Sequence, residues 1–568
     1  MNDANRDVNL DAAPDALLDV DVIVLGSGAS ALAAAVAAHG FGAERVAVFE
    51  KADVVGGTSA MSGGMIWVPC NHHMAEQGIG DSRDDALRYL DSLSHDRIIP
   101  ALAEAYIDTG PEMVRWFEDH TPVQFEIVED FPDYHPEQPG GSTTGGRSLE
   151  CPLFPFDELG TWRDRVSQSR QMGRHVVMNE TTLGRGATTG IAREVLAQRE
   201  LDDVRGCGQA LIGRLLRACL DRGIEPRIGH RAVGLEVTDG RVTGVRFEGP
   251  DGSVVATASR GVILATGGFE WNPDLIRSFI RGPLERPVSI ETNTGDGLTM
   301  AMRIGAALGN MQEAWWVPVI DVTDERGETI PWMVNRERVQ PRSIMVNRSG
   351  RRFANEAANY NAFGAAFHQL DPGSFDYLNM PAWLVFDQGY LSTSGIARYR
   401  GEGVVPEWLT SADTLAELAD AIDIDGPGFE ETVARWNAQV ADLDDPDFGR
   451  GRSVNDTHWG DGTRTAAATL GPIDRGPFYA VQVRPGALGT KGGPRTNEHA
   501  QVLDVGGEVI DGLYAAGNVM ASAMGMTYGG AGGTLGPGMV FGFAAGRHAA
   551  TTPPTRPPTR PPIERISA

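Results

Sequence analysis

The hydrophobic pattern near the start of the chain predicts a strand, a helix and a second strand in close succession. Residues 19–25 read D-V-D-V-I-V-L, a short β-branched run typical of a buried parallel strand. A glycine-containing turn and an alanine-rich helix follow, and residues 45–50, R-V-A-V-F-E, form the next apolar run. These elements make a β-α-β unit of about 30 residues. We therefore expect an α/β, Rossmann-like fold.

The pattern further along the chain predicts more elements of both kinds. Helical spacing indicates helices near 84–93, near 99–119 and over 208–222, whereas alternation indicates paired strands at 229–237 and 241–248. Three more predicted elements are a strand at 262–269 that runs into a glycine turn, a strand at 512–518 and a closing helix at 536–547.

From about residue 290 the strand and helix patterns become less regular and aromatic residues more frequent, which indicates an inserted unit. The simplest architecture is one nucleotide-binding domain made from both ends of the chain, with an α+β substrate domain inserted between them. The expected segments are a flexible arm at 1–18, the first part of the nucleotide-binding domain at 19–290, a catalytic domain at 291–479, the second part at 480–548, and a disordered proline-rich tail at 549–568.

Composition narrows the possible functions. Hydrophobic residues make up 41% of the 568-residue chain and charged residues 22%, as in folded globular proteins. The formal net charge of −27 repels phosphate backbones, so we expect no nucleic-acid partner. Glycine is in excess at 71 residues, and 17 of these fall between 486 and 546. Such glycines suit turns and places where backbone approaches a ligand closely.

The cysteines and the apolar runs bear on location. Four widely spaced cysteines without a C-x-x-C pair argue against a disulfide framework or a zinc site, and we expect no metal. The N-terminal segment lacks the apolar core of a signal peptide, and no apolar run is long enough to span a membrane. We expect a cytoplasmic protein, for which loose association with a membrane stays open.

A dinucleotide motif lies in the first β-α-β unit. Gly26, Gly28 and Ala31 form G-x-G-x-x-A at the turn from strand to helix. The first glycine permits the tight turn, the second lets a pyrophosphate approach the helix N-terminus, and the small third residue lets helix and strand pack. Glu50 ends the second strand, where its carboxylate can accept hydrogen bonds from a ribose.

Several later segments favour FAD over NAD. The stretch K-A-D-V-V-G-G-T-S-A-M-S-G-G after Glu50, the turn A-T-G-G-F at 265–269 and A-A-G-N at 515–518 would add contacts to phosphate or flavin. This set resembles FAD-binding flavoproteins of the glutathione reductase-like fold. It resembles more closely the fumarate reductase/3-ketosteroid dehydrogenase superfamily, in which the flavin is usually non-covalent. The residues expected to hold FAD are Gly26, Gly28, Ser30, Ala31, Glu50, Lys51, Gly57, Thr58, Ser59, Gly63, Gly64, Val233, Ala265, Thr266, Gly267, Gly517, Asn518, Gly533 and Leu535.

Three tyrosines are candidates for catalysis. Tyr528 lies in M-T-Y-G-G-A-G-G-T-L-G-P-G, where a phenol beside glycine-rich backbone offers donors to a substrate oxygen. Tyr360 follows R-R-F-A-N-E-A-A-N, and Tyr134 lies in the proline-rich F-P-D-Y-H-P-E-Q-P-G-G. Each could equally be a packing tyrosine if considered alone.

These motifs, with Q-E-A-W-W-V-P at 312–318 and G-T-K-G-G-P-R-T at 489–496, resemble the bacterial 3-ketosteroid Δ1-dehydrogenases over nearly the whole chain. The resemblance implies that Tyr528 and Gly532 hold the C3 carbonyl, and that Tyr360 removes the C2 proton as a tyrosinate. Tyr134 would assist that base, and the flavin N5 would take the C1 hydride. The implied partners are a 3-ketosteroid and an external electron acceptor, quinone or dye-like.

The chemistry suits these residue types. Hydrogen bonds to the ketone oxygen stabilise the enolate that forms as the neighbouring carbon loses its proton. A phenol with an ordinary pKa near 10 needs a second donor to act as a base. An apolar slot around Trp315, Trp316 and Trp332 would suit a flat polycyclic substrate, although each could be ordinary core.

The chain departs from the family pattern in two places, and other functions stay open. Gly529 stands where the family commonly has Pro, and Gly533 where it has Ala, which makes the exact substrate preference uncertain. The alternatives are a 3-ketosteroid 4(5α)-dehydrogenase, a soluble fumarate reductase-like enzyme, and a non-catalytic flavin-binding protein. The sequence leaves the preferred steroid and the oligomeric state open.

Overall fold

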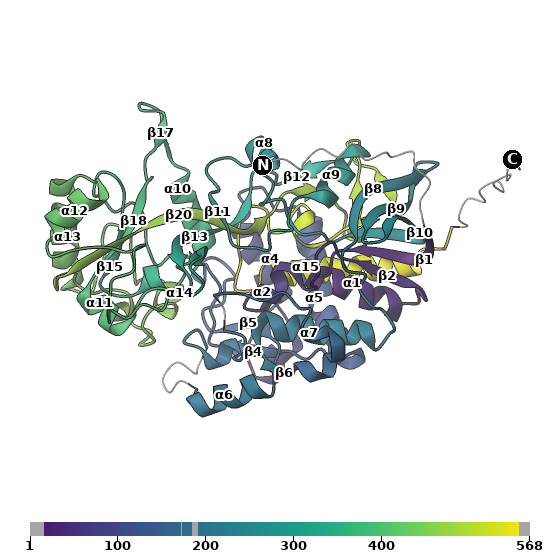
Figure 1. Ribbon diagram of the computed structural model, residues 1–568, viewed down its shortest axis with the longest axis horizontal. Coiled ribbons are helices and arrows are strands. Elements are labelled where there is room, and N and C mark those ends of the chain that lie inside the picture. Colours follow the sequence, from purple (N-terminus) through teal and green to yellow (C-terminus); the bar gives the residue numbers. More distant parts are fainter. Residues whose placement is uncertain (1–15, 172, 185–190, 556–568) are drawn as a thin grey trace, which may run out of the picture.

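The computed structural model describes residues 16–171, 173–184 and 191–555, and its larger part is built on a mixed sheet (Figure 1). The strand order is β2-β1-β10-β23-β22, and β9 and β8 extend it from β10 as an antiparallel arm. β1 pairs in parallel with β2 and β10, and β10 pairs in parallel with β23, as in the expected α/β class. The strands are β1 (Ala16–Leu25), β2 (Val46–Phe49), β8 (Arg231–Thr238), β9 (Arg241–Gly249), β10 (Gly252–Leu264), β22 (Gln501–Leu503) and β23 (Val509–Ala515).

The first and last helices pack closely against each other next to this sheet. α1 (Ala29–Gly40) contacts α15 (Leu535–Thr551) along much of its length. Gly538, Gly542 and Gly546 recur at every fourth position of α15, and a methyl group at any of them would strike α1 at Ser30 or Ala34. Part of the glycine excess therefore serves this packing, which brings the end of the chain to the nucleotide-binding turn.

Both chain ends are ordered slightly further than the sequence predicts. β1 begins at Ala16, where it pairs with Val254 of β10, so residues 16–18 do not belong to an arm. α15 continues to Thr551, and Thr555 still bonds to Ser259, so the expected tail begins later than 549. The sequence does not predict these segments, because apolar alternation is weak in the first and helix propensity is weak in the second. Contacts with β10 hold both in place. The rest of the expected arm, 1–15, and of the tail, 556–568, lies outside the described residues.

Helices and short strands form a layer below the first sheet in Figure 1. α5 packs on α4 and α15, and α7 packs on α1. The helices predicted near 84–93, near 99–119 and over 208–222 are present as α4, α5 and α7, within two residues at each end. The layer consists of α2 (Gly57–Met61), α3 (His72–Glu76), α4 (Arg83–Ser92), α5 (Pro100–His120), α6 (Arg193–Leu201), α7 (Cys207–Leu220), β3 (Ile66–Trp67), β4 (Glu126–Glu129), β5 (Gly145–Glu150), β6 (Phe154–Pro155), β7 (Val204–Arg205), η1 (Phe156–Trp162) and η2 (Met178–Glu180).

The second sheet, at the left of Figure 1, has the order β14-β13-β20-β18-β15, with β11 and β19 paired to β20. Its strands are β11 (Arg286–Pro287), β13 (Ala314–Thr323), β14 (Thr329–Met333), β15 (Ser343–Val346), β18 (Ala382–Asp387), β19 (Thr410–Ala412) and β20 (Phe478–Thr490). The helices around it are α10 (Tyr360–Phe367), α11 (Gln388–Thr393), α12 (Leu415–Ile422), α13 (Gly426–Val440), α14 (Val454–His458), η4 (Glu337–Val339) and η5 (Ala466–Ala468).

Short elements connect the two sheets. They are α8 (Pro273–Phe279), α9 (Asp296–Arg303), β12 (Leu308–Gly309), β21 (Gly493–Pro494) and η6 (Gly517–Val519), while β16 (Leu370–Asp371) and β17 (Asp376–Tyr377) form a separate hairpin. The division expected after Tyr479 falls inside β20, which pairs with β18 at its start and with β13 at its end. Tyr479 and Ala480, the residues on either side of the expected division, both lie within this strand.

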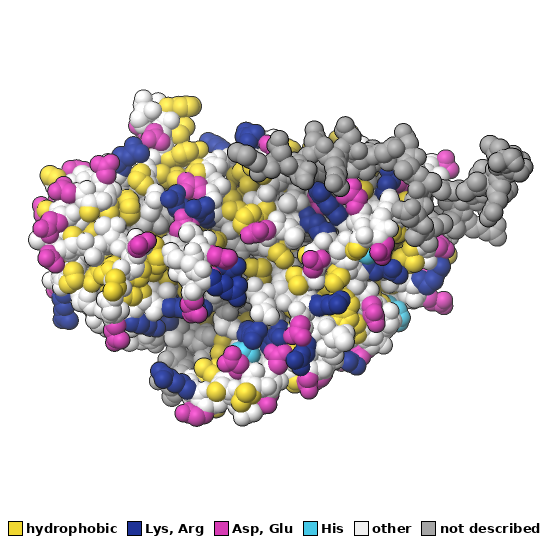
Figure 2. All heavy atoms as spheres, in the orientation of Figure 1, with side chains coloured by type: hydrophobic (Ala, Val, Ile, Leu, Met, Phe, Trp, Pro, Cys, Tyr) yellow, Lys and Arg dark blue, Asp and Glu magenta, His cyan; other side chains and the backbone are white. Residues whose placement is uncertain are grey.

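The surface agrees with the acidic composition. On the face shown in Figure 2, Asp and Glu side chains are spread over both lobes, with basic side chains interspersed among them. All four cysteines are free. Among the described residues, no helix is long and apolar enough to cross a membrane.

Candidate active site

A cavity of about 420 Å³ is lined by residues from both sheets and from distant parts of the chain. All of the predicted cofactor and catalytic residues line it except Ala31, Val233 and Gly533. The lining segments include the turn after β1, residues 57–64, the turn after β10 and the two loops that precede α15. The fold thus brings together motifs that are separated by up to about 500 residues in the chain.

The three exceptions have separate structural reasons. Ala31 is fully buried within α1, where a small residue lets the helix pack. Val233 lies at an irregularity of the β8–β9 pairing between Ala232 and Gly234, and Ala232 lines the cavity in its place. Gly533 lies between two lining residues, and its Cα faces the ring of Tyr528.

The carboxylate of Glu50 lies at the end of β2 against the nucleotide-binding turn. Ser27 Oγ donates to Glu50 Oε2 at 2.7 Å, and the Ala52 backbone N–H donates to Oε1 at 2.8 Å. Burial raises the pKa of Glu50, and these two hydrogen bonds oppose that shift. The orientation of the carboxylate is fixed, and each oxygen keeps a lone pair for a further donor such as a ribose hydroxyl.

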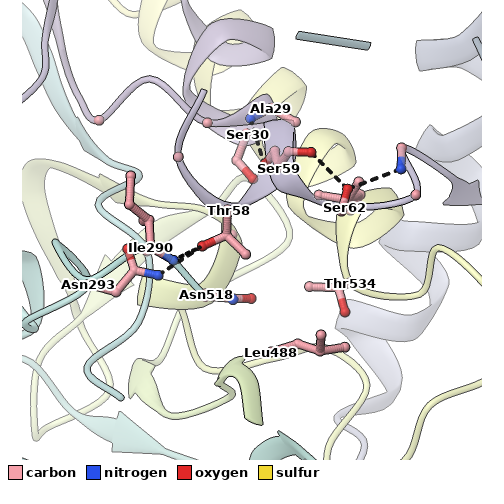
Figure 3. Close-up of a pocket in the computed structure, with 18 of the residues that line it drawn as sticks. Ala29, Ser30, Thr58, Ser59, Ser62, Ile290, Asn293, Leu488, Asn518 and Thr534 are labelled. Atoms are coloured by element: carbon pink, nitrogen blue, oxygen red, sulfur yellow. Dashed lines mark hydrogen bonds between the residues drawn. The ribbon is translucent and has the colours of Figure 1, made fainter. Parts of the chain in front are cut away.

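Small hydroxyl residues form the wall beside the turn (Figure 3). Gly26 has φ +103°, which only glycine adopts without strain, and its Cα lies against the Ala265 carbonyl of the neighbouring turn. Ser59 Oγ accepts a 3.1 Å hydrogen bond from the Ala29 N–H at the start of α1. Thr58 Oγ1 accepts from Asn293 Nδ2 at 3.2 Å. This wall offers short polar groups and bare backbone beside the positive end of α1.

Three tyrosines converge on the other part of the cavity. Tyr134 donates a 3.0 Å hydrogen bond to the hydroxyl of Tyr360. The ring of Tyr528 lies 5.2 Å from that of Tyr134 and 5.5 Å from that of Tyr360, measured between centroids. Thr534 Oγ1 donates to the Tyr528 hydroxyl at 3.0 Å. Three phenols from three separate segments therefore form one buried cluster.

Buried charges hold the proline-rich loop that carries Tyr134. The carboxylate of Asp133 accepts from Trp67 Nε1 at 2.7 Å and from Arg147 at 2.7 Å. The Tyr134 backbone N–H then donates to the Gly529 carbonyl at 3.0 Å. The loop is fixed by this buried ion pair, and it is tied directly to the residue that follows Tyr528.

Capping and a buried lysine position the other two tyrosines. The Asn359 side chain accepts from the Ala362 N–H and caps α10, whose first residue is Tyr360. Lys491 Nζ donates to the carbonyls of Met526 and Thr527 at 2.9 and 2.8 Å, just before Tyr528. Its ammonium also lies 4.2 Å from the ring centroid of Trp315, which contacts Tyr528. Burial lowers the pKa of Lys491 to about 7.

The electrostatics of the cluster favour neutral phenols in the free protein. Burial raises the pKa of Tyr134 and Tyr360 well above 10, and it also raises the pKa of Tyr528. A phenolate at Tyr360 would accept the hydrogen bond from Tyr134, which stabilises the charged form. The same arrangement supplies a donor for a substrate oxygen at Tyr528.

The tryptophans differ from the predicted slot. Trp332 lines the cavity, but Trp315 and Trp316 do not. Trp315 lies behind Tyr528 with its Nε1 bonded to Asn518, and Trp316 stacks edge-on against His368 in a separate core. Adjacent residues of a strand point to opposite faces, so both could not line one wall. Trp459 lines the cavity instead, 6.2 Å from the ring of Tyr360.

Several lining residues were not predicted from the sequence. Ser27 and Asn293 contribute polar groups on the nucleotide side, and Asn335, Arg336 and Glu337 also line the cavity. Ser27 stands inside G-x-G and could have been noticed there. The other residues lie in irregular segments whose position depends on the second sheet.

Comparison with known proteins gives concordant matches. A family profile described as FAD binding domain matches residues 21–535. The chain is 42% identical to 4-oxocyclohexanecarboxylate 2-dehydrogenase of Sinomonas cyclohexanicum, over 93% of this chain and 92% of that protein. It is 37% identical to 3-oxosteroid 1-dehydrogenase of Mycolicibacterium smegmatis, over 94% and 98% respectively. The crystal structure of 3-ketosteroid Δ1-dehydrogenase from Sterolibacterium denitrificans with 1,4-androstadiene-3,17-dione matches at TM-score 0.87 and 35% identity, covering 94% of this chain and 99% of that chain.

Proposed function

The chain belongs to the FAD binding domain family and is a flavin-dependent oxidoreductase, and from this premise we propose that it introduces a C1–C2 double bond into 3-ketosteroids. The observation that carries the proposal is the contact of Tyr134, Tyr360 and Tyr528 on the wall of the cavity that also holds the nucleotide-binding turn. The names of two relatives, a 3-oxosteroid 1-dehydrogenase and a Δ1-dehydrogenase, support the same reaction.

The residues of the nucleotide side fit FAD. The start of α1, the oriented Glu50 carboxylate and the hydroxyls of Thr58 and Ser59 match the chemistry of a pyrophosphate and a ribose. Lys51 also lines this wall, but its ammonium is paired with Asp296 at 2.9 Å. We therefore assign to Lys51 a role in shaping the wall, with no direct ion pair to phosphate.

Tyr528 and Gly532 are the proposed carbonyl-binding groups. A phenol O–H and a backbone N–H that both point at one oxygen stabilise the negative charge that develops there as the adjacent carbon is deprotonated. Gly532 has φ +97°, and a Cβ at this position would lie 2.5 Å from the Ile66 backbone carbon. Only glycine therefore fits at this position in the loop.

Tyr360 is the proposed base, and Tyr134 positions it and stabilises its charged form. Once Tyr360 is deprotonated, it can take the C2 proton, while the Tyr134 hydroxyl donates to the same oxygen. Bound FAD supplies the acceptor for the hydride that leaves C1. An external acceptor, quinone or dye-like, then has to reoxidise the flavin.

The choice between 1,2- and 4,5-dehydrogenation can be tested directly. A 4(5α)-dehydrogenase is the main alternative and would use the same carbonyl chemistry. The test substrate is 5α-androstane-3,17-dione, which is saturated at both positions, with a dye as acceptor and the product identified by NMR. A C1–C2 double bond supports the proposal, and a C4–C5 double bond would replace it with the alternative.

A small ring ketone is a second candidate substrate. The 42% identical relative is named for 4-oxocyclohexanecarboxylate, a ketone that carries a carboxylate. One arginine, Arg336, lies on the cavity wall of this chain and could meet such a group. The reaction would again remove two hydrogens beside a ring ketone, so the assigned roles of the tyrosines would not change.

A further inference from the structure

One wall of the cavity, remote in sequence from the nucleotide motifs, is formed by residues 332–337, which run from the end of β14 into η4. Four polar or amphipathic side chains of this segment line the cavity, namely Trp332, Asn335, Arg336 and Glu337. Apart from Lys51, Arg336 is the only lysine or arginine that lines the cavity in the part of the chain that the structure describes. The segment therefore adds positive charge to an otherwise largely apolar wall.

Arg336 has no partner in the part of the chain that the structure describes. Its Nε is buried without a hydrogen-bond acceptor, and no carboxylate of a described residue lies within 4 Å of its guanidinium nitrogens. Lys51, by contrast, has both an ion pair with Asp296 and a hydrogen bond to Thr294. Burial lowers the pKa of Arg336, and the attraction of the nearby Glu337 carboxylate only partly opposes this shift.

The adjacent acid does not neutralise this charge by contact. Glu337 Oε1 accepts a 2.9 Å hydrogen bond from Trp332 Nε1, and burial raises the pKa of this carboxyl. Asn335 Oδ1 is also buried without a partner among the described residues. This wall thus has unsatisfied polar groups of both kinds, which is costly unless a ligand compensates them.

Gln340 links the segment that carries Arg336 to Trp459, which lies beside the tyrosines. The Gln340 amide donates to the carbonyl of Arg336 and to that of Trp459, at 3.1 Å in each case. The ring of Trp459 in turn lies 6.2 Å from Tyr360 and 6.4 Å from Tyr134, between centroids. Trp459 therefore connects the reacting end of the cavity to the wall that carries Arg336.

We propose that Arg336 is a carboxylate anchor, so that the preferred substrate is a ring ketone that also carries a carboxylate. The inference rests on the proposed function, because it places the ketone at Tyr528 and the acid at Arg336. A guanidinium forms two parallel hydrogen bonds to a carboxylate, and such charge-assisted pairs are strong where water is excluded. A neutral diketone would leave Arg336 unpaired.

The experiment compares acids with their methyl esters, so that ring and ketone stay constant. One pair is 4-oxocyclohexanecarboxylate and its ester, and the other is 3-oxochol-4-en-24-oate and its ester. Wild-type holoenzyme should show a higher kcat/KM for the acid of at least one pair, by roughly 10-fold or more. R336Q should remove this preference and leave turnover of the ester within about threefold, and R336K should retain part of it.

A matched control is Arg398→Gln. Arg398 lies over the ring of Trp332 at 5.6 Å, does not line the cavity, and has a side chain that is 63% exposed. R398Q removes one positive charge from the same region, so it reports general electrostatic attraction. The acid preference should persist in R398Q. Equal loss in R398Q and R336Q would overturn the anchor.

Calorimetric titration of the same acids separates this inference from the proposed function. If R336Q weakens binding of the acid by about tenfold or more, the anchor is supported. If, in addition, no ketone reduces the flavin, the anchor stands and the proposed dehydrogenation is refuted. Turnover of the neutral esters with no acid preference in wild type, and no change in R336Q, would overturn the anchor alone. If R336Q binds no flavin, R336K carries the test. The pair in which the acid is preferred over its ester shows whether the anchored substrate is a monocyclic acid or a steroid with a side-chain acid.

Discussion

The hydroxyls of Tyr134 and Tyr360 lie 3.0 Å apart although 226 residues separate them in the chain. Neither helix nor sheet pairing brings them together. Tyr134 comes from a loop fixed by the buried Asp133–Arg147 pair, and Tyr360 is the first residue of α10. Two phenols on separate supports thus share one hydrogen bond, which is the arrangement that a tyrosinate base requires.

Replacing either hydroxyl should separate the roles of the base and its support. Tyr360→Phe removes the proton acceptor, so we expect turnover and C2 hydrogen–deuterium exchange to fall by about 10³-fold or more. Tyr134→Phe removes only a hydrogen-bond donor, and a fall of about 10- to 100-fold is expected. Tyr479→Phe is the control, because its hydroxyl bonds to Gln388 away from the cavity. Exchange at the wild-type rate in Tyr360→Phe would exclude it as the base.

The rate should depend on pH in a direction set by Tyr360. Burial raises the pKa of Tyr360 well above 10, so the reactive phenolate is a small fraction of the protein near neutral pH. That fraction grows about tenfold for each pH unit below the pKa, so kcat/KM should rise through pH 7–9 without a plateau. Tyr134→Phe removes a donor to the phenolate and should shift the rise to higher pH. A flat profile over this range contradicts the assignment.

The two glycines after Tyr528 should respond differently to alanine. At Gly533 an added Cβ would lie 3.1 Å from Cδ2 of the Tyr528 ring and 3.1 Å from the Gly530 carbonyl oxygen, two tight contacts that small shifts of ring and loop can relieve. Gly533→Ala should therefore lower turnover severalfold and leave FAD bound. Gly532→Ala combines φ +97° with a 2.5 Å contact to backbone, so it should displace the loop and remove activity. Flavin content and circular dichroism distinguish the two cases, and equal activities would show that loop geometry is unimportant.

Lys491 should make stability depend on pH. Burial lowers its pKa in the folded protein to about 7, below the ordinary value of about 10.4. Between these values the unfolded chain binds more protons, so the free energy of unfolding gains up to about 1.4 kcal/mol per pH unit from this residue as pH rises. Below pH 7 both states are protonated and this gain stops.

The comparison is wild type against Lys491→Met, which keeps the apolar stem but cannot titrate. Thermal unfolding at pH 7 and at pH 9 should show wild type gaining stability relative to the variant over this interval. The variant should also turn over more slowly, because the carbonyls of Met526 and Thr527 lose their donor next to Tyr528. Parallel stability curves would indicate that Lys491 keeps an ordinary pKa.

Local patterns in the sequence predict most of the residues that line the nucleotide side of the cavity, although they miss Ser27 and Asn293. The turn after β1, Glu50 and residues 57–64 follow one another over about 40 positions, and strand–helix periodicity specifies how they fold. The tyrosines were identified by the motifs around them. Their convergence depends on long-range contacts, such as the Tyr134 N–H to Gly529 carbonyl bond, which composition and periodicity do not encode.

The errors have the same origin. Val233 was predicted to contact FAD, but an irregularity in the β8–β9 pairing places Ala232, not Val233, on the cavity wall. Trp315 and Trp316 looked like slot residues, but strand alternation within β13 turns them to opposite sides, and neither reaches the cavity. Arg336 belongs to a segment without periodicity, and only its lack of a partner in the fold reveals it.

The most direct test of the account is an anaerobic titration of purified holoenzyme with androst-4-ene-3,17-dione, followed by flavin absorbance and product analysis. The account predicts that the flavin is bleached and that one C1–C2 double bond forms per flavin reduced. Tyr528→Phe should keep its flavin and be bleached about 10²- to 10³-fold more slowly. Bound flavin that neither this steroid nor 4-oxocyclohexanecarboxylate can bleach would contradict the central claim.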